Sequence, residues 1–129
     1  MLQLRTNQYS KYNTLAQPTA AMNIDDSVMS RLSGLSHSHQ WILFTSDCPR
    51  PDFNQFSSSK VSCNKIIHMK PSQSMSELET VTKAIKSGNA CAIVASNNID
   101  QVNQALLKTL ASHHECEVFF VEGRGQKYH

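Results

Sequence analysis

Glycine is scarce in this sequence, and its placement excludes the usual phosphate-binding loops. The chain has 129 residues and only four glycines, at positions 34, 88, 123 and 125. A P-loop or a dinucleotide fingerprint needs glycines between a strand and the following helix, because backbone N–H groups there must approach a phosphate. The segment after the apolar run 41–45 contains no glycine, and Gly88 precedes an apolar run. We therefore expect no nucleotide cofactor.

Long apolar runs and an excess of one charge are also missing. No stretch approaches the roughly 20 apolar residues that cross a bilayer, and the N-terminus lacks the apolar core of a secretory signal. The net charge is only +2, and the lysines and arginines are scattered. These absences predict a cytoplasmic protein that binds neither membrane nor nucleic acid.

The cysteines and histidines form no recognisable catalytic or metal motif. The pattern CxxC is absent, so four free, reduced thiols are expected, at positions 48, 63, 91 and 116. The segments 113–116 (HHEC) and 37–39 (HSH) could suggest metal ligands. A zinc site needs three or four ligands at defined spacing, so a solvated helix end and a polar linker are the favoured interpretations. Cys48 is the one thiol expected near the carboxyl edge of a sheet. The chain also contains no GxSxG elbow.

Short apolar runs alternate with helical segments along the chain. The runs predict strands over 41–45, 65–69, 90–96 and 117–121. This order predicts a small, mostly parallel sheet with helices on its faces, an α/β fold. The polar segment 1–22 predicts a loosely ordered tail, 23–122 a single domain, and 123–129 a flexible C-terminal tail.

The helix within residues 72–89 has the clearest signals. Ser74 and Glu77 have the spacing of a capping box, and Gly88 supplies a left-handed residue at its end. Its predicted buried face consists of Met75, Leu78, Val81 and Ile85.

Three further helices are predicted. The first begins at Asp25 or Asp26 and ends at Gly34. The second has Pro51 in its first position, with Phe53 and Phe56 on one side. The third is capped by Asn97 and Asn98, and its predicted apolar face consists of Ile99, Val102, Leu106 and Leu110.

A combination of weak motifs, in a fixed order, covers residues 40–129. Trp41 lies in the first strand, Lys65 opens the second, residues 76–89 lead into an apolar strand, and the chain ends in Tyr128 and His129. This arrangement resembles the SulA family of SOS-induced bacterial cell-division inhibitors. The sequence departs from the family pattern at three points. Gln40 or His39 stands where the family has Arg before the first-strand Trp, and Phe53 is the nearest aromatic residue to the family's second Trp. Ala95–Ser96 replaces a Trp at the end of the later strand.

The resemblance implies a RecA-like fold that lacks a phosphate-binding loop, and no enzymatic activity. It implies binding to FtsZ, the tubulin-like division GTPase, which blocks polymerisation and septum formation. Trp41, Phe44, Phe53 and Lys65 match family positions for partner binding. The resemblance also implies a homodimer and removal by the Lon protease, with Tyr128 and His129 in the recognition signal.

A second function from another class remains open. The chain could be a recombination or repair accessory protein that kept a RecA-like scaffold and binds a recombinase or DNA. The small net charge and the lack of a basic stripe count against DNA.

Overall fold

The sheet is parallel throughout the part of the chain that the computed structural model describes, residues 22–124. Its strand order is β3-β2-β4-β5, and each neighbouring pair is parallel. The strands are β2 (Trp41–Phe44), β3 (Ile66–His68), β4 (Ala90–Ser96) and β5 (Glu117–Val121). The predicted fold class is therefore confirmed.

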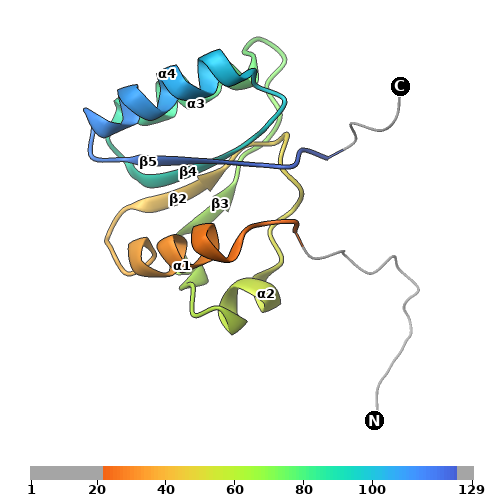
Figure 1. The fold of residues 1–129 in the computed structure, drawn as a ribbon, viewed down its shortest axis with the longest axis vertical. Coiled ribbons are helices and arrows are strands. Elements are labelled where there is room, and N and C mark those ends of the chain that lie inside the picture. The colour runs from red at the N-terminus through yellow and green to blue at the C-terminus, as the bar shows by residue number, and fades with distance from the viewer. Residues whose placement is uncertain (1–21, 125–129) are drawn as a thin grey trace.

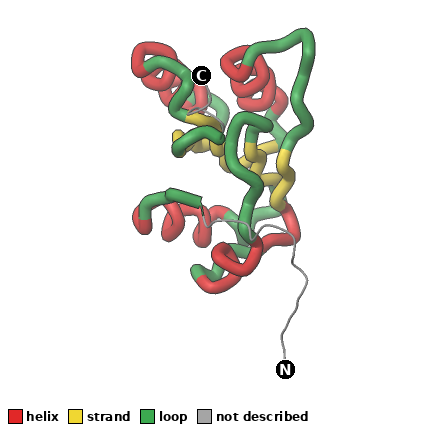
Figure 2. Tube along the Cα trace, turned by 90° about the vertical axis from the view of Figure 1, so that its right-hand side faces the viewer, coloured by secondary structure: helices red, strands yellow, loops and turns green. Residues whose placement is uncertain are grey.

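Helices cover both faces of this sheet, which makes three layers (Figure 1). Helices α1 (Asp26–Leu35) and α2 (Phe53–Ser58) lie on one face, and α3 (Glu77–Ser87) and α4 (Gln101–Ser112) lie on the other. Figure 2 shows the same layers from the side. A short 3-10 turn, η1 (Cys63–Lys65), leads into β3.

The central strand carries the core. Every residue of β4 is buried, as expected for a parallel strand covered on both faces. On one side Ile42 and Phe44 join a cluster with α1 and α2, and on the other Ile93 packs with Val81 and other residues of α3 and α4. The fully apolar run 41–44 suggests a strand that is buried on both faces, but Trp41 at its start is exposed.

The capping box of α3 is displaced by two residues from its predicted position. Ser76 accepts a hydrogen bond from the Glu79 backbone N–H, and the Glu79 carboxylate accepts one from the Ser76 backbone N–H. The sequence SMSELE contains two Ser-x-x-Glu spacings, and the helix uses the second. Gly88 ends the helix with φ 76°, as predicted.

The other helix ends correct several sequence-based expectations. Helix α1 runs through Gly34 to Leu35. Helix α2 begins after Asp52, whose carboxylate accepts hydrogen bonds from two backbone N–H groups, so Pro51 lies outside it. Helix α4 is capped by Asp100 and not by Asn97 or Asn98. The backbone N–H of Asn97 donates to the carbonyl oxygen of Val121, so Asn97 still belongs to the edge of the sheet, before the helix begins.

The buried face of α4 also differs from the prediction. Leu107 and Ala111 pack against the sheet, whereas Val102 and Leu106 are 70% and 60% exposed. Ile99 is buried but lies before the helix, so it does not set the phase of the helix. Leu110, the last residue of the predicted face, is partly buried and packs against the same cluster, so the prediction is wrong for Val102 and Leu106.

Both ends of the described region are attached to the domain. Met22 is buried and exchanges two hydrogen bonds with the side chain of Gln55. Gly123 is buried, and the backbone N–H of Arg124 donates to the carbonyl oxygen of Asp47. The domain limits drawn from the sequence stay a prediction, and Tyr128 and His129 lie outside the described residues.

Candidate functional site

The strand order creates a switch point between β2 and β4. The connection after β2 packs through α2 on one face of the sheet, and the connection after β4 packs through α4 on the other. In open α/β sheets, ligands bind in the crevice outside the carboxyl ends of such a strand pair. Here these ends are Thr45, which follows β2, and Ser96, the last residue of β4.

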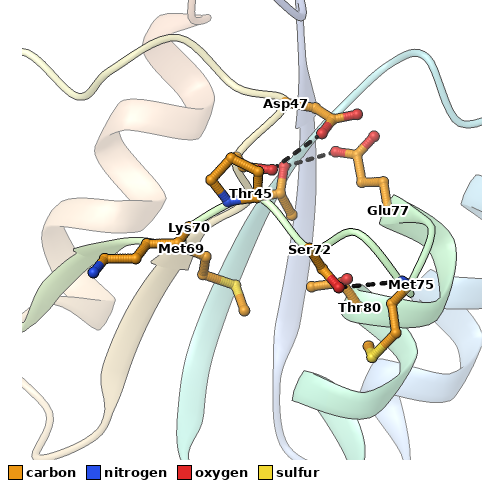
Figure 3. A pocket seen from close by; sticks show the side chains of 10 residues that line it. Thr45, Asp47, Met69, Lys70, Ser72, Met75, Glu77 and Thr80 are labelled. Carbon is orange, nitrogen blue, oxygen red and sulfur yellow. Dashed lines mark hydrogen bonds between the residues drawn. The ribbon is translucent and has the colours of Figure 1, made fainter.

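A carboxylate of the protein itself occupies this crevice. Glu77, from the first turn of α3, accepts a hydrogen bond from Thr45 Oγ1 at 2.7 Å. It also accepts from Ser96, at 2.6 Å from the backbone nitrogen and 2.6 Å from Oγ. Figure 3 shows Glu77 pointing from its helix toward Thr45. The end of β4, where open α/β sheets bind ligands, therefore binds a carboxylate of the chain itself.

The space that remains beside Glu77 is small. Its volume is about 110 Å³, and its wall includes Asp47, Met69, Lys70 and Ser72. Pockets that hold drug-sized ligands or cofactors have volumes of roughly 300–1,000 Å³. The remaining cavity is therefore too small for a nucleotide.

Cys48 lies at the same edge of the sheet, as the sequence predicted. Its thiol is buried and contacts the Thr45 hydroxyl and the carbonyl oxygen of Val94. Burial raises the pKa of Cys48 from 9.0 to about 12, and the charge of Glu77 acts in the same direction. A thiol with this pKa is protonated at neutral pH and is a poor nucleophile.

A second candidate region lies along β2 and β3, on the face of the sheet that α3 covers. Helix α3 contacts β4 and helix α4 contacts β5, so this helical layer leaves part of β2 and β3 uncovered. Trp41 and Ile67 are consequently 36% and 39% exposed. The Lys65 ammonium group stands over the Trp41 ring, 4.5 Å from its centroid, in a cation–π contact.

Trp41 and Ile67 belong to an apolar groove between α3 and the sheet edge. The groove has a volume of about 360 Å³, and Leu43, Met69 and Ala84 contribute to its wall. Lys83 is the one charged residue among the described residues that line it. We call this surface the β3-edge groove. It presents apolar area beside two lysines, Lys65 and Lys83.

The structure separates the four residues that the resemblance assigned to partner binding. Trp41 and Lys65 are in contact at the β3-edge groove. Phe44 is fully buried, with its ring centroid 5.5 Å from that of Phe56, so it presents no surface to a partner. Phe53 is exposed at the start of α2, and its carbonyl oxygen is near the thiol of Cys63 in η1.

Sequence reasoning missed the residues that close the switch point. Glu77 was assigned to the capping box, and neither Thr45 nor Ser96 was singled out as a contact. The signal that could have found the site is the second Ser-x-x-Glu spacing, which leaves Glu77 free to face the sheet.

Within residues 22–124 no group of three or more His, Cys, Asp or Glu residues could hold a metal ion. No helix in that part of the chain is long and apolar enough to cross a membrane.

Comparisons with known proteins bear on the fold. No protein-family model matches the chain, and no curated protein matches its sequence. Among solved structures, SulA from Pseudomonas aeruginosa matches with a TM-score of 0.54 over 74% of this chain and 84% of that one. The chain shares the fold of SulA. Because the identity is 11%, the likeness to SulA is one of fold, and at that level it confirms the resemblance found in the sequence.

Proposed function

We propose that this protein is a SulA-like inhibitor of cell division that binds FtsZ and blocks its polymerisation, without enzymatic activity of its own. The observation that carries the proposal is the contact between Lys65, which is half-buried, and the exposed ring of Trp41, which lines the β3-edge groove. The shared fold supports it, and the family resemblance supplies the partner. The occupied switch point and the protonated Cys48 thiol argue against a nucleotide-dependent or thiol enzyme.

The chemistry of the groove suits a protein partner. Binding energy at interfaces is concentrated in a few residues, with tryptophan, tyrosine and arginine enriched among them. Trp41 offers an exposed aromatic ring that already contacts Lys65 within the folded chain. The Lys65 ammonium group is held over that ring, 4.5 Å from its centroid. A cation beside an apolar surface favours a partner segment that combines apolar and acidic side chains.

The decisive experiment is FtsZ assembly with GTP, followed by light scattering during titration with this protein. We expect the wild type to suppress assembly, and Lys65→Ala to need more than tenfold higher concentration, about 1.4 kcal/mol of binding free energy. Lys108→Ala is the matched control, since Lys108 also lies over an aromatic ring, Phe120, at 5.8 Å from its centroid. This control should inhibit as well as the wild type.

The outcomes separate the two functions that the sequence left open. Unaffected FtsZ assembly, combined with retention of the protein on single-stranded DNA at moderate salt, would favour a recombination accessory protein. Suppression that is equally weakened by both lysine substitutions would remove the β3-edge groove from the inhibitory surface. The homodimer that the resemblance implies and the cytoplasmic location expected from the sequence composition stay predictions.

A further inference from the structure

The switch-point crevice is built from neutral hydrogen-bond donors that are almost completely buried. Thr45 is 2% exposed and Ser96 is 0% exposed. Three donors point at one position: the Thr45 hydroxyl, the Ser96 hydroxyl and the Ser96 backbone N–H. A buried donor without an acceptor costs about 1–3 kcal/mol. The folded chain therefore requires an acceptor at this position, and Glu77 is the group that provides it.

The donor set suits a single carboxylate. Both oxygens of Glu77 are engaged, Oε1 by one donor and Oε2 by two. Among the described residues no lysine or arginine forms an ion pair with Glu77. Asp47, whose carboxylate accepts from the Ser46 hydroxyl, lines the same cavity and adds negative charge, whereas Lys70, which also lines it, extends away from Glu77 (Figure 3). A site with neutral donors and a neighbouring carboxylate favours a monoanion over a phosphate dianion.

We infer that the carboxyl ends of β2 and β4 form a carboxylate-binding site, whose ligand in the native chain is the side chain of Glu77. The site has the position of a ligand site in an open α/β sheet, but the ligand is covalently part of α3. The interaction joins the first turn of α3 to the two central strands. Small free carboxylates, such as acetate, occupy the same donors when the Glu77 side chain is removed.

The site also supports the wall of the β3-edge groove. Met69, Met75 and Thr80 line both the cavity beside Glu77 and the groove. Met75 lies two residues before Glu77, and Thr80 is one turn further along the helix. The inference about the carboxylate site does not depend on the proposed function, because it concerns the folded chain alone.

The test is chemical rescue of Glu77→Ala. The melting midpoint is measured in sodium acetate and in sodium chloride at equal ionic strength, with the fluorescence of Trp41, the one tryptophan in the chain, as the signal. Acetate binds only the folded form and should raise the midpoint of Glu77→Ala by several degrees. Wild type, with its site filled, should show no acetate-specific rise. Inorganic phosphate should rescue less than acetate.

Two further variants make the result specific. Glu79→Ala removes a carboxylate from the same helical turn, but one that caps the helix at an exposed position. It should be destabilised without rescue by acetate. Adding Thr45→Val to Glu77→Ala removes one donor and should abolish most of the rescue. If Glu77→Ala is unfolded in chloride, acetate should restore its native fluorescence. An acetate effect that is absent, or equal in Glu79→Ala, would overturn the inference.

Discussion

The backbone nitrogen of Ser96 lies 2.6 Å from the carboxylate of Glu77, although the two residues belong to different layers of the fold. Ser96 ends the central strand, and Glu77 begins the helix that precedes that strand in the chain. The contact closes the crevice in which related scaffolds bind a phosphate. A negative charge fixed at this position repels a nucleotide.

We therefore predict that ATP and GTP bind no tighter than about 1 mM, a binding free energy near −4 kcal/mol. Isothermal titration calorimetry of the wild type provides the measurement. Micromolar affinity for either nucleotide would contradict the assignment of Glu77 as the resident anion. Glu77→Gln removes the charge and keeps the shape, so a gain in nucleotide affinity in that variant would separate charge repulsion from steric exclusion.

The packing of α3 predicts a large cost for a small deletion. Ile85 is almost fully buried against the sheet, within the cluster that includes Ile93. Ile85→Ala should lower the free energy of unfolding by about 2–5 kcal/mol, as large-to-small substitutions in cores do. Val102→Ala is the control, because that side chain is 70% exposed and should lose under about 0.5 kcal/mol. Urea denaturation measures the free energy of unfolding of both variants, provided that their m-values equal that of the wild type. Equal losses of stability in the two variants would show that the buried face of α3 or the exposed face of α4 is wrongly assigned.

The buried thiols predict a loss of stability at alkaline pH. Burial raises the pKa of Cys48 to about 12 and that of Cys116 to about 11, from 9.0 in the unfolded chain. The unfolded state releases these protons first, so the stabilisation is complete below pH 9 and falls as the pH rises toward 11–12. For Cys48, three pKa units correspond to about 4 kcal/mol.

Two measurements check this prediction. Urea unfolding between pH 8 and 11 should show a steeper decline for the wild type than for Cys48→Ala. Alkylation of the folded protein at pH 8 should modify Cys63 first, because it is only half-buried. Rapid modification of Cys48 under those conditions would show that the edge of the sheet opens.

The sequence predicts the central part of the fold well because its signals are local and do not conflict. The strand 90–96 is an uninterrupted run of small and apolar residues, and Gly88 has the conformation that the end of α3 requires. The face of α4 could not be predicted in the same way. Its segment has apolar residues on two sides, and only contact with the sheet selects Leu107 over Leu106.

The candidate sites also depend on contacts between distant residues, which local sequence patterns do not determine. Trp41 and Lys65 were named from the resemblance, but their contact depends on the register of two parallel strands, which no local pattern encodes. The Glu77 site joins residues 32 and 19 positions apart, through a chain reversal that the capping pattern alone does not determine. Phe44 was assigned to partner binding from the resemblance, yet the alternation of side chains places it on the face of β2 opposite to Trp41.

The next prediction concerns degradation of the protein by Lon through its C-terminal residues. Truncation after Arg124 deletes Tyr128 and His129 but retains the hydrogen bond from Arg124 to Asp47. Every contact described for the folded chain is kept, so we expect an unchanged melting midpoint. In cells that contain Lon, the truncated protein should have a longer half-life in a chase experiment. Equal decay of both forms would place the recognition signal elsewhere, and equal decay in cells without Lon is the control.

Trp41 provides a direct signal for partner binding. It is the one tryptophan of the chain, and its ring is 36% exposed beside Lys65. Contact with a partner removes water from the ring, so its emission should shift to shorter wavelength when FtsZ is added. Trp41→Phe, mixed with FtsZ at the same concentrations, gives the background from any tryptophan of the partner.

The shift in Trp41 emission should follow the same concentration dependence as the inhibition of assembly. It should weaken by about tenfold in Lys65→Ala, which is about 1.4 kcal/mol, and remain unchanged in Lys108→Ala. Inhibition of FtsZ without any change in Trp41 emission would move the binding surface away from the β3-edge groove and leave the inhibitory function standing.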